Sequence, residues 1–424
     1  KIIKNDKLLD FAAMRRNGGF MANENDSRSR GRFGIYGGQY VPETLMNVLV
    51  SLEEAYHTCI EDEEFCEELA ALLKRVARRP SRLYYAQNLT KELGGAQIYF
   101  KREDLNPTGS HCINSALGQV LLAKWMGKTG VIADTASGSN GVAVAAAAAI
   151  LGLSCDVFMG IDDMARQRAQ VDKMHLLGAT VHIVSVGKQG QGLWKDALSE
   201  AMREWSNRVE DTNLVLSSAI GPHPYPTIVK GFQTLISREI KERCLYEIGR
   251  LPDMVIAPVG GGAAALGAFE EFLEEDEIAL IGCEAAGELL DGETSPSALT
   301  TGRKGIFHGM KTYFCQDEEG QIEPVASCAP GLAYPGVSPE LAHLFDTERV
   351  EILAVTDEEA LDAFEHVAHS EGILVSLESA HALACVTFLA PELDEDKVIV
   401  VVITGSGDKD CEEILRMRDG GDGE

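Results

Sequence analysis

The sequence contains no apolar run that is long enough to cross a bilayer. Its longest run spans residues 141–153, whereas a membrane helix needs roughly 20 apolar residues. The amino-terminal residues also lack the long apolar segment of a secretory signal. We therefore expect a cytoplasmic protein that has no membrane partner.

Cysteine is present but does not form a recognisable framework. The ten cysteines lie singly, without a Cys-x-x-Cys pair and without paired metal-ligand spacing. Disulfide frameworks are typical of small secreted chains, and zinc sites are usually visible as closely spaced ligand pairs. We expect reduced thiols and no metal site.

Basic residues are in short supply. The chain has 38 Lys and Arg against 66 Asp and Glu, which gives a formal net charge of −28. A protein that binds nucleic acid needs basic patches on its surface, so this balance argues against a nucleic-acid partner. The acids are spread along the chain, which is typical of a solvated acidic surface.

Short β-branched runs alternate with amphipathic or alanine-rich segments. This alternation predicts an α/β fold whose parallel sheets are covered by helices on both faces, arranged as two lobes that meet at a cleft. Its 424 residues are enough for such lobes. Strands are expected at residues 98–101, 130–133, 155–159, 180–184, 254–258, 279–283 and 398–403. Helices are expected at residues 112–126, 142–151 and 194–205.

Four strand-to-helix loops carry residues that could hold a ligand. They are residues 106–112, 134–141, 260–267 and 404–410. A glycine-rich turn after a strand is common for structural reasons alone. However, ligands in α/β proteins bind at the carboxyl ends of strands, so four such loops predict one shared site.

Several motifs in order resemble the tryptophan synthase β subunit, from about residue 32 to residue 415. The resemblance implies a fold-type II pyridoxal-phosphate (PLP) architecture, a homodimer and an α-subunit-like protein partner. The motifs are Phe33–Leu45, Lys101–Asn106, Leu117–Gln119, Gly221–Pro226, Gly309–Lys311, Gly331–Pro335, Leu377–Ser379 and Gly407–Asp410.

The resemblance also suggests how the chain is divided. Residues 1–32 are expected to be a flexible extension, and residues 78–230 an N-terminal lobe that includes a communication-like region. Residues 33–77 together with 231–424 are expected to form the C-terminal lobe. The loop at residues 187–192 corresponds roughly to the surface through which the family's two subunits communicate.

The match fails at the chemical centre. Cys112 stands where the family has the lysine that forms a Schiff base with PLP, and a thiol cannot form an imine. Ala263 and Ala264 replace two phosphate-binding side chains, so Gly260, Gly261 and Gly262 are expected to be a vestigial phosphate loop. On these grounds no cofactor is expected and PLP is disfavoured, although the resemblance suggests a monovalent cation near Gly260.

Cys112, His111 and Asp134 are the candidate catalytic residues. Cys112 begins a predicted helix, where a thiol pKa is lowered, and His111 precedes it. Asp134 could act as a general base. Cys112 could thus be a nucleophile, and its alternatives are an inert thiol or a ligand contact without chemistry. For Asp134 the alternative is a structural carboxylate at a helix start. The candidate substrate-binding residues are Ser110, Thr135, Ser137, Gly138, Ser139, Asn140, Glu378 and Thr404.

These substitutions favour the loss of PLP-dependent β-replacement. We expect a repurposed, PLP-independent enzyme that acts on a small aromatic, indole-like or amino-acid-derived substrate in the cleft. One alternative is a pseudoenzyme that allosterically regulates an α-subunit-like partner. The other alternative is a residual PLP-dependent lyase. The hydroxyl and thiol groups expected in the cleft favour an enzyme over a pseudoenzyme.

Overall fold

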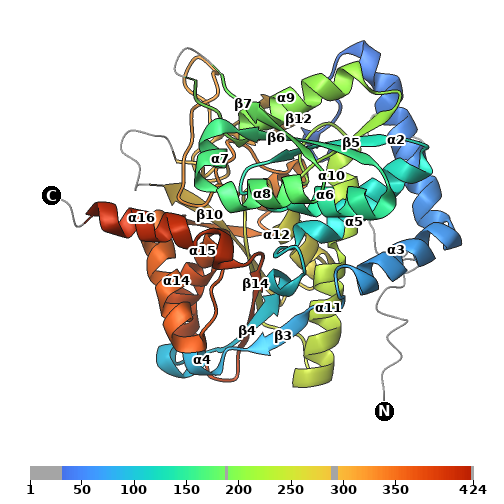
Figure 1. Cartoon of the computed structure of the whole chain (residues 1–424). Helices are drawn as coiled ribbons and strands as arrows, with labels where there is room; N and C mark the ends of the chain where they lie inside the picture. Colours follow the sequence, from blue (N-terminus) through green and yellow to red (C-terminus); the bar gives the residue numbers. More distant parts are fainter. Residues whose placement is uncertain (1–30, 187–189, 288–294, 422–424) are drawn as a thin grey trace.

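The computed structural model describes residues 31–186, 190–287 and 295–421. Within these ranges the strands form three sheets, two of them built mainly from parallel strands (Figure 1). The predicted extension at residues 1–32 falls almost wholly outside the described residues, as do residues 187–189 of the predicted communication loop.

The largest sheet has six strands in the order β13-β10-β9-β14-β4-β3. All of its neighbouring strands run parallel except β3 and β4, which pair antiparallel at one edge. Every residue of β9 and β14 is buried, which explains their unbroken apolar sequences. The strands are β3 Arg82–Tyr85, β4 Gln97–Arg102, β9 Met254–Pro258, β10 Ala279–Gly287, β13 Glu351–Thr356 and β14 Val398–Ile403.

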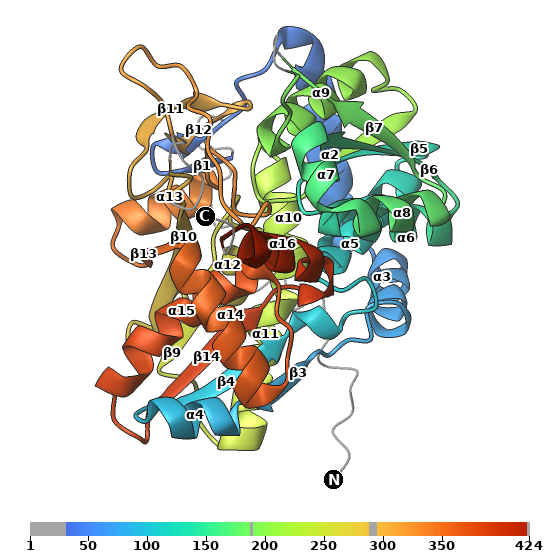
Figure 2. The same cartoon turned by 60° about the vertical axis from the view of Figure 1, so that its left-hand side comes forward.

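A second sheet has four parallel strands in the order β7-β6-β5-β8. Helices lie on both of its faces, as the alternating pattern predicts (Figures 1 and 2). The strands are β5 Gly130–Thr135, β6 Ser154–Gly160, β7 Thr180–Val184 and β8 Thr212–Val215. The helices around it are α5 Cys112–Trp125, α6 Ser139–Leu151, α7 Ile161–Arg166, α8 Arg168–Leu176 and α9 Trp194–Asn207.

The third sheet is small and antiparallel, in the order β1-β2-β12-β11. Its strands are β1 Arg32–Phe33, β2 Tyr36–Gly37, β11 Arg303–Phe307 and β12 Met310–Phe314. The remaining α-helices are α2 Glu43–Glu61, α3 Glu63–Arg75, α4 Gln87–Leu93, α10 Tyr225–Gln233, α11 Leu235–Arg243, α12 Ala263–Phe269, α13 Pro339–Asp346, α14 Asp357–Glu371, α15 Leu377–Leu389 and α16 Cys411–Gly421.

The α/β fold class with parallel sheets is therefore confirmed, and the predicted strands and helices are all present. The lobe boundaries are less simple. The strands β3 and β4, which the sequence assigns to the N-terminal lobe, pair with β14 of the six-stranded sheet. The predicted division of the chain stays a prediction.

A buried ion network lies at the β3–β4 edge of the larger sheet. The carboxylate of Glu239 accepts hydrogen bonds from Arg79 and from the Lys101 ammonium, both at 2.5 Å, and Arg79 also pairs with Glu103. Burial lowers the pKa of Lys101, and Glu239 opposes that effect. Burial alone would raise the pKa of Glu103, but Arg79 and Lys101 bring it down to about 2. The ammonium group of Lys101 therefore has a structural role as the buried partner of Glu239.

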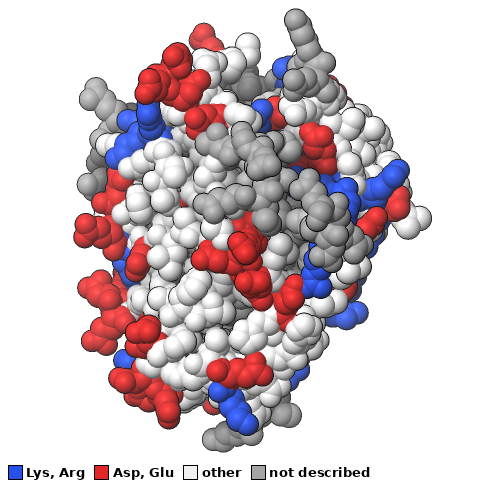
Figure 3. All heavy atoms as spheres, turned by 90° about the vertical axis from the view of Figure 1, so that its left-hand side faces the viewer, with Lys and Arg blue, Asp and Glu red and all other residues white. Residues whose placement is uncertain are grey.

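In the part of the chain that the structure describes, no helix is long and apolar enough to span a bilayer. On the face shown in Figure 3, acidic side chains cover more of the surface than basic ones, in keeping with the net charge of −28.

We predict that Glu239→Gln destabilises the protein by about 3–5 kcal/mol, because it leaves buried cations without their counter-charge. The free energy of unfolding, measured by urea denaturation, checks this value. Glu68→Gln is the control, since Glu68 pairs with Lys124 on the surface and its loss should cost less than about 1 kcal/mol. Equal effects in the two variants would contradict the prediction.

Candidate active site

One pocket lies where strands of both large sheets end. It encloses about 660 Å³ of empty space, including its opening to solvent. Thr135 ends β5, Pro258 ends β9 and Thr404 follows β14, and all three line the pocket. Because the loops after parallel strands emerge at the same edge of a sheet, segments distant in sequence meet here. The other lining residues are Ser110, His111, Cys112, Ala136, Ser137, Ser139, Asn140, Trp194, Ser217, Ser218, Gly260, Gly261, Gly262, Ala263, Ala264, Gly331, Leu332, Ser376, Glu378, Gly405 and Lys409.

Cys112 and His111 lie together at this pocket. Cys112 is the first residue of α5, and its Sγ is 3.9 Å from the Nε2 atom of His111. The side-chain amide of Gln233 donates to Nδ1 of His111 at 3.1 Å, so the neutral imidazole carries its proton on Nε2, toward the sulfur. Neighbouring side chains on a helix diverge, but His111 reaches Cys112 because it precedes the first turn.

The two groups stabilise each other's charged forms. Burial by itself would raise the pKa of Cys112, but His111 and the Ser110 hydroxyl outweigh it and the pKa falls below the ordinary value. Burial would lower the pKa of His111, whereas the Cys112 sulfur raises it above the ordinary value. Each group therefore makes the charged form of the other easier to reach than it is for a free side chain.

Asp134 stands behind the pocket and is not among its lining residues. Its carboxylate accepts three hydrogen bonds, from the Trp194 indole at 2.6 Å, the Ser217 hydroxyl at 2.5 Å and the Ser217 backbone N–H at 3.1 Å. Burial raises its pKa despite these donors. In this arrangement Asp134 positions Trp194 and Ser217, both of which line the pocket. Its proposed role as a base stays a prediction.

The loop after β5 supplies the hydroxyl-rich wall. Ser137 donates to the hydroxyl of Ser139 at 3.2 Å, and Asn140 donates to the backbone oxygen of Asp134 at 2.8 Å. Gly138, the N-cap of α6, has a φ of +76° and does not line the pocket. Its part is to turn the chain, because a residue with a side chain rarely adopts this conformation.

The glycine loop after β9 is packed closely against its surroundings. A side chain at Gly260 would place its Cβ 2.2 Å from the backbone oxygen of Gly331, and Gly262 has a φ of +96°. The hydroxyl of Ser218 accepts a hydrogen bond from the backbone N–H of Ala263 at 3.1 Å. The loop therefore brings backbone groups to the pocket wall, where an anion can approach them closely.

A charged group forms another part of the pocket. Lys409 donates to Glu378 at 3.2 Å and to Asp410 at 2.7 Å. Burial would lower the pKa of Lys409, but these two carboxylates raise it above the ordinary value. Thr404 lies close by, with its hydroxyl 3.1 Å from the hydroxyl of Ser379.

The structure thus brings together all the predicted site residues except Asp134 and Gly138. It also adds lining residues that the sequence did not single out, chiefly Trp194, Ser217 and Ser218. Trp194 is the first residue of α9. The sequence offered no reason to place it in a site, because an aromatic residue at the start of a helix usually belongs to the hydrophobic core. The two serines follow β8, and the strand-to-loop position was a signal that could have identified them.

Known proteins resemble this chain in sequence and in fold. The sequence profile of the family described as "Pyridoxal-phosphate dependent enzyme" matches residues 75–405. A tryptophan synthase beta chain from Lactiplantibacillus plantarum is 49% identical over 395 residues, which are 93% of this chain and 98% of the relative. The crystal structure of a pyridoxal 5'-phosphate-dependent aspartate racemase aligns with a TM-score of 0.60 at 18% identity, covering 82% of this chain and 97% of that one. The last match bears on the fold alone.

These comparisons correct three expectations: that the chain is a PLP-independent enzyme, that it is a pseudoenzyme, and that PLP is disfavoured. The family match over residues 75–405, together with 49% identity across 93% of the chain to a tryptophan synthase beta chain, indicates a PLP-dependent enzyme instead. The expectations gave too much weight to position 112. A lysine there would add one covalent bond, whereas the loops that surround a cofactor make many contacts that do not depend on it.

We predict that Cys112 reacts with iodoacetamide at pH 7 faster than the other thiols. Its pKa is lowered, so more of it is thiolate at this pH, whereas burial raises the pKa of Cys59, Cys155 and Cys315. Peptide mass spectrometry over time measures each rate. His111→Gln should slow the labelling of Cys112 and shift its pH midpoint upward. Uniform labelling of all cysteines would contradict the assignment.

Proposed function

Since the chain belongs to the pyridoxal-phosphate-dependent enzyme family and is a relative of tryptophan synthase β chains, we propose that it is a PLP-dependent lyase that holds its cofactor without a covalent bond. The substrates we infer are an amino acid and a small indole-like molecule. The observation that carries the proposal is the pocket itself, which combines a glycine loop, a hydroxyl-rich wall and a buried ion group at the strand ends of both sheets.

The pocket fits the anionic end of PLP. Gly260, Gly261 and Gly262 present backbone rather than side chains to the pocket, and they lead directly into α12. Backbone N–H groups in such a loop suit a phosphate, and the Ser218 hydroxyl adds a donor on the same side. Ala263 and Ala264 contribute no polar side chain, so the phosphate is held mainly by backbone groups.

The pocket also fits the ring of PLP. The Thr404 hydroxyl shares a hydrogen bond with Ser379, which lets it donate to or accept from a ring nitrogen. The described residues that line the pocket offer no available amine to which the aldehyde of PLP could bind covalently. Among the residues that the structure describes, Lys409 is the only lysine that lines the pocket, and it is committed to Glu378 and Asp410.

When bound, PLP supplies an aldehyde that condenses with amines and a ring that withdraws electrons from the substrate's α-carbon. This chain's own residues then have to bind and orient the substrate and move its protons. We assign proton transfer to Cys112 and His111, whose Sγ and Nε2 atoms lie 3.9 Å apart at the pocket. The hydroxyls of Ser137 and Ser139, with the amide of Asn140, suit the substrate's carboxylate.

The relative's name identifies one chain of a larger enzyme, and we extend this to the assembly of the present chain. We propose a homodimer that also binds an α-type chain. The surface near β7 suits such a contact, because Ile183 is 62% exposed and Ile161 and Val186 on adjacent segments are also exposed. β7 is moreover an edge strand of its sheet.

We predict that the purified protein binds PLP reversibly, and that the cofactor is lost on dialysis because no amine retains it. Cys112→Lys should supply that amine, so borohydride should fix the cofactor to the chain only in this variant. Cys112→Met, which has similar length and no amine, is the matched control. Absorbance after gel filtration and mass spectrometry measure the attachment. If neither the wild type nor Cys112→Lys binds PLP, the proposed function fails.

We predict that an α-type chain of the same organism coelutes with this protein in size-exclusion chromatography, and that Ile183→Asp weakens the association at least about tenfold. Such a loss corresponds to about 1.4 kcal/mol, in the range of one buried apolar contact. Leu415→Asp, at an exposed apolar position on α16, is the control. An unchanged dissociation constant in Ile183→Asp would place the interface elsewhere.

A further inference from the structure

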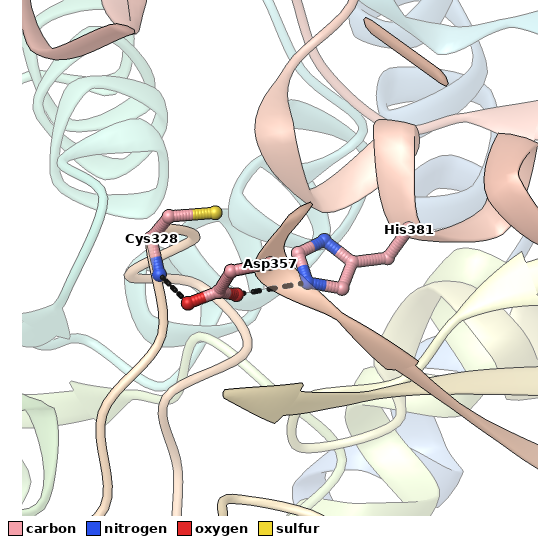
Figure 4. Close-up of side chains that lie close together, drawn as sticks. All are labelled: Cys328, Asp357 and His381. Atoms are coloured by element: carbon pink, nitrogen blue, oxygen red, sulfur yellow. Dashed lines mark hydrogen bonds and ion pairs between the residues drawn. The ribbon is translucent and has the colours of Figure 1, made fainter. Parts of the chain in front are cut away.

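Three metal-binding side chains meet in the interior behind the pocket. Cys328 lies in the segment before Gly331, Asp357 begins α14, and His381 lies on α15 (Figure 4). One ligand atom from each lies within 4.8 Å of the others. All three residues are buried, so bulk water does not compete for their lone pairs.

The hydrogen bonds of His381 set the direction of its lone pair. Its Nδ1 atom is 2.8 Å from the backbone oxygen of Leu377, and a carbonyl oxygen can only accept, so Nδ1 carries the proton. In the neutral imidazole, Nε2 is then an acceptor, yet it faces the Oδ1 atom of Asp357 at 3.3 Å. Two acceptors at this distance repel each other unless a proton or a metal ion lies between them.

Asp357 is held in place by donors on its other side. Its Oδ2 atom accepts the backbone N–H of Cys328 at 2.8 Å, and its Oδ1 atom accepts the hydroxyl of Ser327 at 2.7 Å. Each carboxylate oxygen has a second lone pair that these bonds leave available. Such outer hydrogen bonds orient the ligands in metal sites, as does the bond from His381 to Leu377.

The surroundings favour a cation. The carboxylates of Asp357, Asp410 and Glu378 all lie close enough to the Cys328 thiol to act on it electrostatically. Two cations lie nearby, and both already have carboxylate partners. Lys409 pairs with Glu378 and Asp410, and Arg166, which donates to the backbone oxygen of Ser327 at 3.1 Å, pairs with Asp163. A divalent ion would displace the thiol proton and offset part of the negative charge of these carboxylates.

We propose that Cys328, Asp357 and His381 bind a divalent ion of the zinc class, with a water molecule in the fourth position. Thiolate and imidazole together suit Zn²⁺ better than Mg²⁺ or Ca²⁺, which take oxygen ligands. Tetrahedral Zn²⁺ with bonds of about 2.0–2.3 Å separates its ligand atoms by roughly 3.3–3.8 Å. The Asp357–His381 separation of 3.3 Å already meets this, and the sulfur lies within 4.8 Å of the other two ligand atoms, so it has to move closer when the ion binds.

The ion would join two segments that line the pocket. Cys328 precedes Gly331 and Leu332, while His381 lies one turn after Leu377 and Glu378 on α15. The ion would have a structural role, because it would bind the segment before Gly331 to α15 on the side of these segments that faces away from the pocket. The inference does not depend on the proposed function, since none of the three ligands lines the pocket.

Cobalt(II) is the probe, because a Co²⁺–thiolate bond gives an intense near-ultraviolet band and tetrahedral Co²⁺ gives visible bands. The chelator-treated protein is titrated with Co²⁺, and a second sample is refolded in Co²⁺ so that burial cannot prevent entry. We expect saturation at one equivalent, loss of the bands when Zn²⁺ is added, and a higher melting midpoint with either ion.

Cys328→Ala should abolish the near-ultraviolet band and weaken Zn²⁺ binding on the order of 100-fold or more. Cys155→Ala removes a buried thiol of the other large sheet and should change neither. Asp357→Asn, which keeps the acceptor for the Cys328 N–H, should weaken binding without unfolding the chain. The proposal is overturned if Co²⁺ gives no thiolate band in either preparation, or if the band survives Cys328→Ala. It is also overturned if nitrogen NMR shows both His381 nitrogens protonated after refolding in Zn²⁺.

Discussion

The pocket depends on one geometric constraint, the parallel direction of the central strands. In a parallel sheet every strand ends at the same edge, so the loops after β5, β9 and β14 open toward one volume. The two sheets present these edges to each other, and a glycine loop, a hydroxyl-rich loop and a buried ion group become neighbours. None of these segments would hold a ligand alone. A ligand pocket forms only where these loops lie next to one another.

The buried charges show how such a site is supported. Arg79, Lys101, Glu103 and Glu239 form a closed network at one edge of the larger sheet, and Lys409, Glu378 and Asp410 form another beside the pocket. In each network every carboxylate has a cationic partner in a region that excludes water, where an isolated charge would be very costly, although Lys409 serves two carboxylates. The consequence for chemistry is that neither Lys101 nor Lys409 is free to react.

Position 112 separates two tasks that one lysine performs together in the family. Holding a cofactor needs many weak contacts, which the glycine loop and the hydroxyls around Thr404 can supply without an amine at that position. Storing the cofactor covalently needs an amine, and Cys112 has none. The thiol instead gains a polar partner in His111, so the position retains a group that can carry a proton. We see this as a change in how the cofactor is retained.

The sequence by itself determined the α/β class, the strands and helices, and most of the pocket, since β-branched runs and the loops after them are local signals. It also showed the thiol at position 112. It did not place Asp134 behind Trp194, because the direction of a carboxylate depends on donors far away in the chain. It could not show the cluster of Cys328, Asp357 and His381 either. These residues have no shared spacing, and they meet only because α14 and α15 pack together beside the segment that holds Cys328. Long-range packing, which no local pattern encodes, decided both.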